Sequence, residues 1–350
     1  MAGSSNSERC WEVISRFTNV HTLSLDCFDS FFTAPQIELF TTQFSQVTSL
    51  FIETSSFRNT NDFVACVGTF PAVHTLGFMS IWFWEYPEEQ PSLPDPIPGT
   101  NIRRIVVSSI GSECTDSICP WLSRLPFESF HDVELVCKAV PGITLAALLP
   151  ALGDSLTKLH MDELPEWSRM PEDEEDEEDE EDEVYFGVNN NPFNPTLEKN
   201  TELRSIVVGG MKIPGSQPIH GSNLLESFSP IFATINSKHF SQLEFQWDIG
   251  QEYTMDPYEF FGLDRLVKHG ALSTQSPLPV LVFSLRSTEE IESVEAGRIT
   301  NLLRAWMDDA DARGALSVIF GLHPSVVDHS DFTMMRRSME LELLIESLWT

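Results

Sequence analysis

Val20-His21-Thr22-Leu23-Ser24-Leu25 decides the fold of this chain, because variants of the stretch return along the sequence. Residues 44–52 hold a second copy and residues 70–78 a third. Each copy has an apolar residue, two mostly polar residues, a second apolar residue, a variable one and a third apolar residue. Such a pattern is typical of a short β-strand with one buried face. We therefore predict a series of similar strands, each entered through a turn.

The central apolar residues of these copies recur regularly. In the first half of the chain they follow a period of about 26–29 residues, at Leu23, Leu50, Leu76, Ile105, Val133 and Leu159. Further copies follow with a longer period of about 37–38 residues, at Ile206, Leu243, Leu281 and Val318. One strand with a helix or 3₁₀ turn in every repeat of about 20–29 residues is the pattern of leucine-rich repeats. The sequence therefore predicts an α/β fold, a leucine-rich-repeat-like solenoid with a curved parallel sheet and helices on its outer face.

Helical patterns occupy the intervals between the predicted strands. Asp62 is expected to cap a helix over residues 63–67. Asp116 is expected to cap another over residues 118–125, with Pro120 tolerated in its first turns. Strands that alternate with helices in this way are typical of parallel sheets with right-handed crossovers.

Later segments follow the same alternation. The apolar run 144–152 predicts a helix that Gly153 ends. The longer period of the second half leaves room for longer helices, which we predict over residues 224–240 and 293–311. Pro279 lacks a backbone N–H, so the strand around it is predicted to begin there or to pair weakly.

The repeat pattern divides the chain into three parts. Residues 1–165 form the array with the shorter period. Residues 166–198 form an acidic insertion predicted to be disordered, because twelve consecutive acidic residues, 172–183, repel one another and favour an extended chain. Residues 199–350 continue the strand–helix repeats with the longer period and end in a capping helix predicted over residues 336–348.

Charge and composition limit the partners and the compartment. The 350 residues include 53 acidic and 21 basic ones, a net charge of −32, which disfavours binding to nucleic acid or to anionic membranes. No run of 18 apolar residues predicts a membrane span, and residues 1–9 lack the apolar core of a secretory signal. Six cysteines without framework spacing indicate reduced thiols, as in the cytoplasm or nucleus.

The segment 17–25, Phe-Thr-Asn-Val-His-Thr-Leu-Ser-Leu, and the segment 70–76, Phe-Pro-Ala-Val-His-Thr-Leu, resemble the degenerate leucine-rich repeats of F-box proteins from mushroom-forming fungi. The resemblance covers roughly residues 11–320. It implies a curved solenoid that captures a target as the substrate-recognition subunit of a Skp1–cullin–F-box ubiquitin ligase. The family's N-terminal F-box is not visible, since the first strand already starts near Val20. The resemblance therefore implies Skp1 and cullin as partners only if an F-box is supplied elsewhere.

Residues that flank the buried positions of each strand are expected on the concave face of such a solenoid. In the central repeats these residues carry both charge signs, which suits a polar protein surface or peptide. The candidate protein-binding residues are Arg104, Asp132, Glu134, Lys158, His160 and Asp162.

No residue pattern predicts a catalytic, cofactor or metal site, so we expect a protein that is not an enzyme. Gly153-Asp154-Ser155-Leu156 spells the nucleophile block of GDSL hydrolases, but none of the nine histidines follows an Asp by three residues. His21 and His74 occupy the same repeat slot, and Cys114 and Cys119 have no second ligand pair at zinc spacing. Walker A, Rossmann, G-x-S-x-G and H-E-x-x-H motifs are also absent from the sequence.

Three hypotheses stay open at this point. A protein-binding scaffold is favoured; a histone-chaperone-like protein would bind basic partners through residues 172–183; a hydrolase would use Ser155 and an unrecognised His.

The aromatic residues 81–84 precede a loop with five prolines between residues 87 and 98, and are either core or an exposed hot spot.

Overall fold

The computed structural model describes residues 19–26, 40–84, 101–110, 112–125, 132–138, 140, 142–162, 195–213, 231–249, 272, 278–287 and 291–322. Ten strands within these ranges form one sheet, in which every hydrogen-bonded pair is parallel. The strands follow one another in chain order: β1 (Thr22–Asp26), β2 (Ser49–Glu53), β4 (Thr75–Met79), β6 (Arg104–Ser108), β7 (Val133–Lys138), β8 (Leu156–Asp162), β9 (Ser205–Ile213), β10 (Gln242–Ile249), β11 (Val280–Ser287) and β12 (Leu316–Leu322). The predicted α/β class with a parallel sheet is therefore confirmed.

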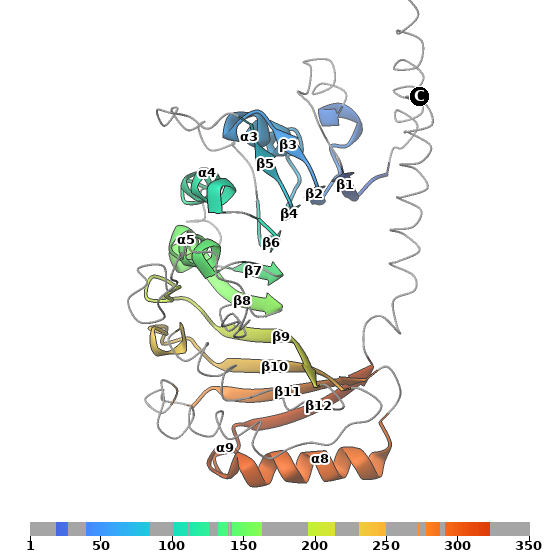
Figure 1. Cartoon of the computed structure of the whole chain (residues 1–350), viewed down its shortest axis with the longest axis vertical. Coiled ribbons are helices and arrows are strands. Elements are labelled where there is room, and N and C mark those ends of the chain that lie inside the picture. The colour runs from blue at the N-terminus through green and yellow to red at the C-terminus, as the bar shows by residue number, and fades with distance from the viewer. Residues whose placement is uncertain are drawn as a thin grey trace, which may run out of the picture.

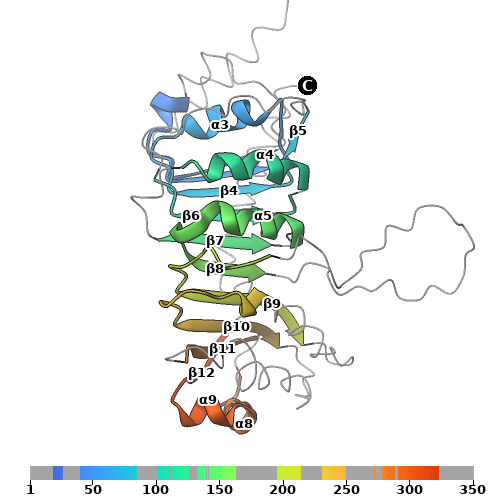
Figure 2. The ribbon, with the colours of Figure 1, turned by 90° about the vertical axis from the view of Figure 1, so that its left-hand side faces the viewer.

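The helices between the first strands cover one face of the sheet. They are α3 (Thr60–Gly68), α4 (Ser112–Leu122) and α5 (Gly142–Leu152). Figure 1 shows them on the outer side of a stack of strands that bends, and Figure 2 shows the same helices in front of the strands. Parallel neighbours need a crossover connection, and these helices supply it. We call the opposite side of the sheet, on the inside of the bend, the inner face.

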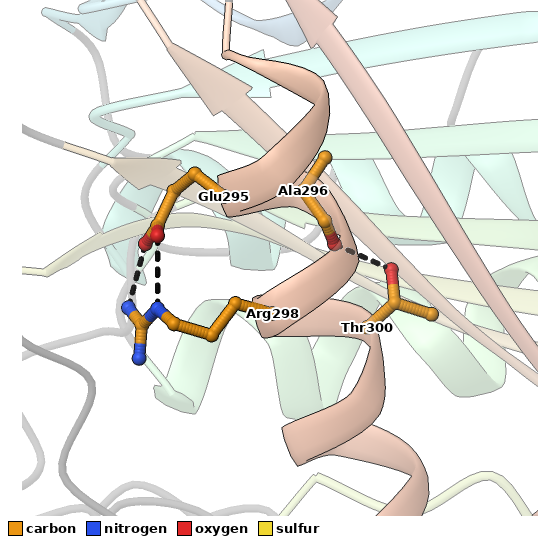
Figure 3. A network of polar contacts seen from close by, with 4 residues as sticks. All are labelled: Glu295, Ala296, Arg298 and Thr300. Atoms are coloured by element: carbon orange, nitrogen blue, oxygen red, sulfur yellow. Dashed lines mark hydrogen bonds and ion pairs between the residues drawn. The ribbon is translucent and has the colours of Figure 1, made fainter.

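The last crossover ends the stack instead of covering the outer face. Helices α8 (Ser293–Trp306) and α9 (Asp308–Ala312) lie beyond β12 (Figure 1), which confirms most of the helix predicted over residues 293–311. On α8 the Arg298 guanidinium donates to both carboxylate oxygens of Glu295, at 2.6 and 2.8 Å (Figure 3). The hydrogen bond with Arg298 lowers the pKa of Glu295. Thr300 Oγ1 donates to the Ala296 carbonyl at 2.8 Å, as Figure 3 also shows.

The register of the strands confirms most of the predicted repeat positions and corrects two. Leu23, Leu50, Leu76 and Ile105 stand opposite one another, as expected. The next position is Leu135 and not Val133, and the last is Leu316 and not Val318.

Both corrections are shifts of two residues, which leave each side chain on the same face of its strand. The repeat length around β7 therefore varies more than predicted, from about 30 residues before Leu135 to about 24 residues after it. In β7, Val133 and Leu135 are both buried, so the apolar pattern admits either register. The pairing with β6 and β8 places Leu135 opposite both Ile105 and Leu159, and an irregularity in the pairing with β8 lies between Val133 and Glu134.

The core lies between the sheet and the outer helices. Phe63 on α3 is fully buried, and its ring makes edge contacts with Phe57, Phe78, Phe83 and Trp121 at centroid distances of 5.4 to 6.4 Å. Each such aromatic pair contributes about 0.5–1.5 kcal/mol beyond the burial of its area. This cluster holds α3 and α4 to the strands on the helix side of the sheet.

A tight corner follows three consecutive strands of the first half. Thr54, Ser80 and Ser109 come directly after β2, β4 and β6, and each has a positive φ of 46° to 48°. Their backbone N–H groups donate to the carbonyls of Met79, Ser108 and Lys138 on the next strand. After the first two corners the chain forms β3 (Ser56–Phe57) and β5 (Trp82–Phe83), which pair as a second, two-stranded sheet. The corners thus keep the repeats in step at the ends of the strands.

The helix starts differ from the predicted ones. Asn59 caps α3, since its side chain accepts a hydrogen bond from the Asp62 N–H at 3.2 Å; Asp62 therefore lies inside the helix. Helix α4 begins at Ser112, four residues before Asp116, so Pro120 lies in its last turn and not in its first turns. In α3 a second capping-type residue, Asn59, thus stands three positions before the predicted one.

Other expectations are met or corrected in the later segments. Helix α5 ends at Leu152, and Gly153 follows with a φ of +49°, as predicted. Strand β11 begins at Val280, directly after Pro279, as predicted. The helix predicted over residues 224–240 is wrong at its end: residues 231–233 are helical, but turns replace the helix from Thr234 onward. The Thr234 hydroxyl donates to the Ile231 carbonyl at 2.7 Å. This bond favours a turn at Thr234 over continuation of the helix.

Several predictions fall outside the described residues. They concern the proline-rich loop 87–98, the acidic run 172–183 and the capping helix 336–348. Across the acidic insertion the sheet continues without a break, because Leu159 of β8 stands opposite Ile206 of β9. No helix within the described ranges is both long and apolar enough to cross a membrane.

Candidate protein-binding face

The inner face consists of side chains that alternate with the core residues of each strand. Parallel strands lie about 4.8 Å apart, so equivalent side chains form columns that cross the sheet. The first column contains Thr22, Ser49, Thr75, Arg104, Glu134, Lys158, Ser205, Gln242 and Val280. The middle column contains Ser24, Phe51, Gly77, Val106, Val136, His160, Val207, Glu244 and Val282. A third column runs from Asp26 through Glu53, Met79, Ser108 and Lys138 to Asp162.

Charged residues gather where β6, β7 and β8 meet on this face. Arg104 Nε lies 3.3 Å from Glu134 Oε2, and about half of the Arg104 side chain is exposed. Lys158 stands opposite Glu134 in the register, and Lys138 stands opposite Asp162 at the end of β8. Both lysines are exposed. The centre of the inner face therefore carries three basic residues beside two acidic ones.

Five of the six predicted site residues come together in this centre, and the sixth does not. Arg104, Glu134, Lys158, His160 and Asp162 lie on adjacent strands. Asp132 precedes β7, and its carboxylate accepts a hydrogen bond from Thr157 Oγ1 at 2.9 Å. The register of β7 explains why Asp132 lies apart from the other five. Because Leu135 and not Val133 stands opposite Ile105, Asp132 precedes the strand and Lys138 belongs to it.

The middle column is apolar next to this charged centre. Val136 is 2% exposed, and Val106, His160 and Val207 are half-buried. Further along the column, the ring of Phe51 lies against Gly77, where an added Cβ would stand 2.3 Å from Phe51 Cδ1. Glycine is therefore needed at this position for the Phe51 ring to lie on the sheet.

A polar network occupies the inner face of β10 and β11. The Glu244 carboxylate accepts hydrogen bonds from Gln242 Nε2 at 3.3 Å, Gln246 Nε2 at 2.8 Å and Ser284 Oγ at 2.7 Å. Arg286 in turn donates to Gln246 Oε1. Sequence reasoning missed this network, because its partners lie 40 residues apart and meet only through the register of the two strands.

The first strands end in an acidic pair. Glu53 stands opposite Asp26, and Ser24 Oγ lies 3.5 Å from Glu53 Oε1. Burial and, second, the charge of Asp26 raise the pKa of Glu53, while the hydrogen bond from Ser24 lowers it. The first strands of the inner face thus end in acidic residues, whereas Arg104, Lys138 and Lys158 lie at its centre.

The aromatic stretch 81–84 is divided between core and surface. Ile81 and Phe83 are buried, whereas Trp82 and Trp84 are 49% and 64% exposed. The main-chain N–H of Trp84 donates to the main-chain carbonyl of Phe57 at 3.0 Å, which holds the backbone of Trp84 beside β3. Exposed tryptophans are enriched among the hot-spot residues of protein interfaces.

The residues considered for chemistry have structural surroundings. Ser155 lies in the short 3₁₀ turn Gly153–Ser155 ahead of β8, and the neighbouring Asp154 accepts a hydrogen bond from Thr201 at 2.7 Å. Cys114 Sγ donates to the Ile81 carbonyl at 2.9 Å, and burial followed by the charge of Asp116 raises the pKa of Cys119 to about 12. Within the described ranges, no three His, Cys, Asp or Glu side chains are grouped as a metal site would need.

Neither family models nor curated proteins match this chain. The geometry of the inner face is therefore the basis for assigning a function.

Proposed function

We propose that this chain is a protein-binding scaffold and not an enzyme, and that it binds a partner protein on the inner face of its sheet. The proposal is carried by the arrangement of side chains on that face. Parallel strands present charged, apolar and polar columns side by side, and the helices α3, α4 and α5 lie on the other side (Figure 1). Mixed polar and apolar surface held rigidly in register is suited to specific protein recognition.

The architecture proposed for the chain is a leucine-rich-repeat-like solenoid. Each repeat up to β8 adds one strand beside the previous one after about 24–30 residues, close to the repeat lengths of that class. Solenoids of this kind bind their partners on an extended concave surface. The inner face occupies the corresponding side of the bent stack in Figure 1.

In its finer form the proposal is a substrate-recognition subunit, as the resemblance to fungal F-box receptors implies. The inner face would then hold the target. Skp1 and cullin would be partners only with an F-box supplied elsewhere. Recovery of both proteins with the purified chain would support this role, and their absence among stoichiometric partners would count against it.

The experiment that tests the scaffold proposal is affinity purification of the full chain from its native cells, with partners identified by mass spectrometry. Val106→Arg and Val207→Arg place a charge in the apolar column of the inner face, and both side chains are half-buried. Ile143→Arg makes the same kind of change on α5, where Ile143 is 39% exposed. We expect the two inner-face variants to lose the main partner and Ile143→Arg to keep it. Equal capture by all three would overturn the proposal.

A second candidate function rests on where the charge lies. The described residues include 18 acidic and 14 basic ones, whereas the whole chain has 53 and 21. Most of the acidic excess therefore lies in the remaining segments, the run 172–183 included, and such a run attracts basic proteins such as histones. Histone binding that survives deletion of residues 172–183 would remove this candidate.

A further inference from the structure

Two lysines mark the ends of the charged centre of the inner face. Lys158 lies in the first column and Lys138 in the third, on neighbouring strands. Their levels differ by four residues along the strand direction, because Lys158 stands opposite Glu134 and Lys138 opposite Asp162. At about 3.3 Å per residue, the two positions are separated by about 13 Å along the strands.

The level midway between the two lysines holds one aliphatic side chain and one imidazole ring. Val136 and His160 stand opposite each other at the level midway between them, and Val136 is buried. A chain segment lying over β7 and β8 would therefore meet a cation, an apolar contact and a second cation in that order.

An extended peptide matches this order. Alternate side chains of a strand point the same way and lie about 6.6 Å apart, so residues i and i+4 are separated by about 13 Å. Carboxylates at i and i+4 reach the two lysines, and an apolar residue at i+2 lies over Val136 and His160. A helix places i and i+4 only about 6 Å apart and does not fit.

The local charges favour carboxylates at these two points. Both lysine side chains are exposed, and the Glu134 carboxylate, opposite Lys158, is engaged by Arg104 at 3.3 Å. At physiological ionic strength, charges farther than about 8 Å are largely screened, so binding at these two points depends mainly on the charges next to them.

We propose that the centre of the inner face binds an extended segment of a partner protein with the pattern acidic-x-apolar-x-acidic, the acidic side chains on Lys138 and Lys158. The inference rests on the scaffold function proposed above and names the chemistry of its partner.

A random peptide library tests the proposal without knowledge of the natural partner. Nine-residue peptides displayed on phage are selected on the immobilised full chain. Synthetic copies of the enriched peptides are then measured by fluorescence anisotropy. We expect enrichment of Asp or Glu at i and i+4 with an apolar residue at i+2. Enrichment of other patterns, or of none, would overturn the proposal.

Charge-reversed variants give the matched comparison. Lys138→Glu/Lys158→Glu is expected to weaken binding of the enriched peptides at least tenfold, and 0.5 M NaCl to weaken binding to the wild type. Lys199→Glu/Lys238→Glu makes the same change at exposed lysines outside the inner face and should leave binding within twofold. Equal loss in both variants would indicate nonspecific charge effects and refute the site. If Val106→Arg and Val207→Arg abolish partner capture but no such peptide is enriched, the scaffold function stands and this inference alone fails.

Discussion

The side-chain amide of Asn200 donates hydrogen bonds to the main-chain carbonyl of Gly153, and to that of Leu149, each at 2.9 Å. Leu149 belongs to the last turn of α5, whose carbonyls lack partners within the helix. Asn200 is fully buried and lies beyond the acidic insertion, 47 residues after Gly153. One side chain therefore closes the end of a helix and fixes the second half of the chain to the first.

Asn200→Ala should destabilise the protein by about 2 kcal/mol, because it removes two hydrogen bonds and leaves the Leu149 carbonyl buried without a donor. Urea denaturation followed by circular dichroism measures the change. Thr201→Ala is the control, since its hydrogen bond to Asp154 is exposed and its loss should cost less than about 1 kcal/mol. Equal effects of the two substitutions would show that the Asn200 contacts do not join the two halves.

Gly77→Ala should destabilise the protein by about 1 kcal/mol, near the low end for overpacking, because the half-buried Phe51 ring can turn away from the new methyl group. The double variant Phe51→Ala/Gly77→Ala removes the ring that the methyl group meets. In a double-mutant cycle we expect Gly77→Ala to be nearly neutral in the Phe51→Ala background. An unchanged cost in that background would place the strain in the backbone and not in the ring contact.

The strands were predictable from the sequence because the apolar positions Leu23, Leu50 and Leu76 alternate with polar ones. The register was not fully predictable, since Val133 and Leu135 are both apolar and lie on the same face. The pairing with β6 and β8 selects Leu135, and the apolar pattern of the strand does not encode that choice.

The same limit applies to the candidate site. Arg104, Glu134 and Lys158 were predicted together because each lies next to a recognisable core position. Lys138 was missed because the assumed register placed the β7 site two residues too early. The hydrogen bond from Ser284 to Glu244 joins residues 40 positions apart, and no local pattern in the sequence announces it.

Thr54→Gly should stabilise the protein by up to about 1 kcal/mol. A left-handed backbone costs a residue with a side chain about 1–2 kcal/mol, which outweighs the extra chain entropy that glycine loses on folding. Thr54→Ala keeps the Cβ and should bring little of this gain. Thermal unfolding of both variants is the measurement, and equal midpoints for glycine and alanine would contradict the strain at this corner. Ser80 and Ser109 each have a φ of 48°, so the same comparison can be repeated at both positions.

Glu53→Gln should stabilise the protein at pH 7 and leave it unchanged near pH 4. Burial, followed by the charge of Asp26, raises the pKa of Glu53 in the folded protein. A carboxyl group with a raised folded pKa supports folding fully below its unfolded pKa of about 4.3, and this support is lost as the pH rises through the folded value. Glutamine carries no charge at either pH, so only the wild type loses the contribution of this side chain to stability over the range.

Urea denaturation midpoints at pH 4 and pH 7 measure the effect of Glu53→Gln. The control is the Asp26→Asn background, which removes the neighbouring charge that contributes to the raised pKa. In that background the gain from Glu53→Gln at pH 7 should shrink and not vanish, because burial is the larger cause. A midpoint at pH 7 that falls on substitution would mean that the hydrogen bond from Ser24 outweighs burial, so that the pKa of Glu53 is lowered and not raised by folding.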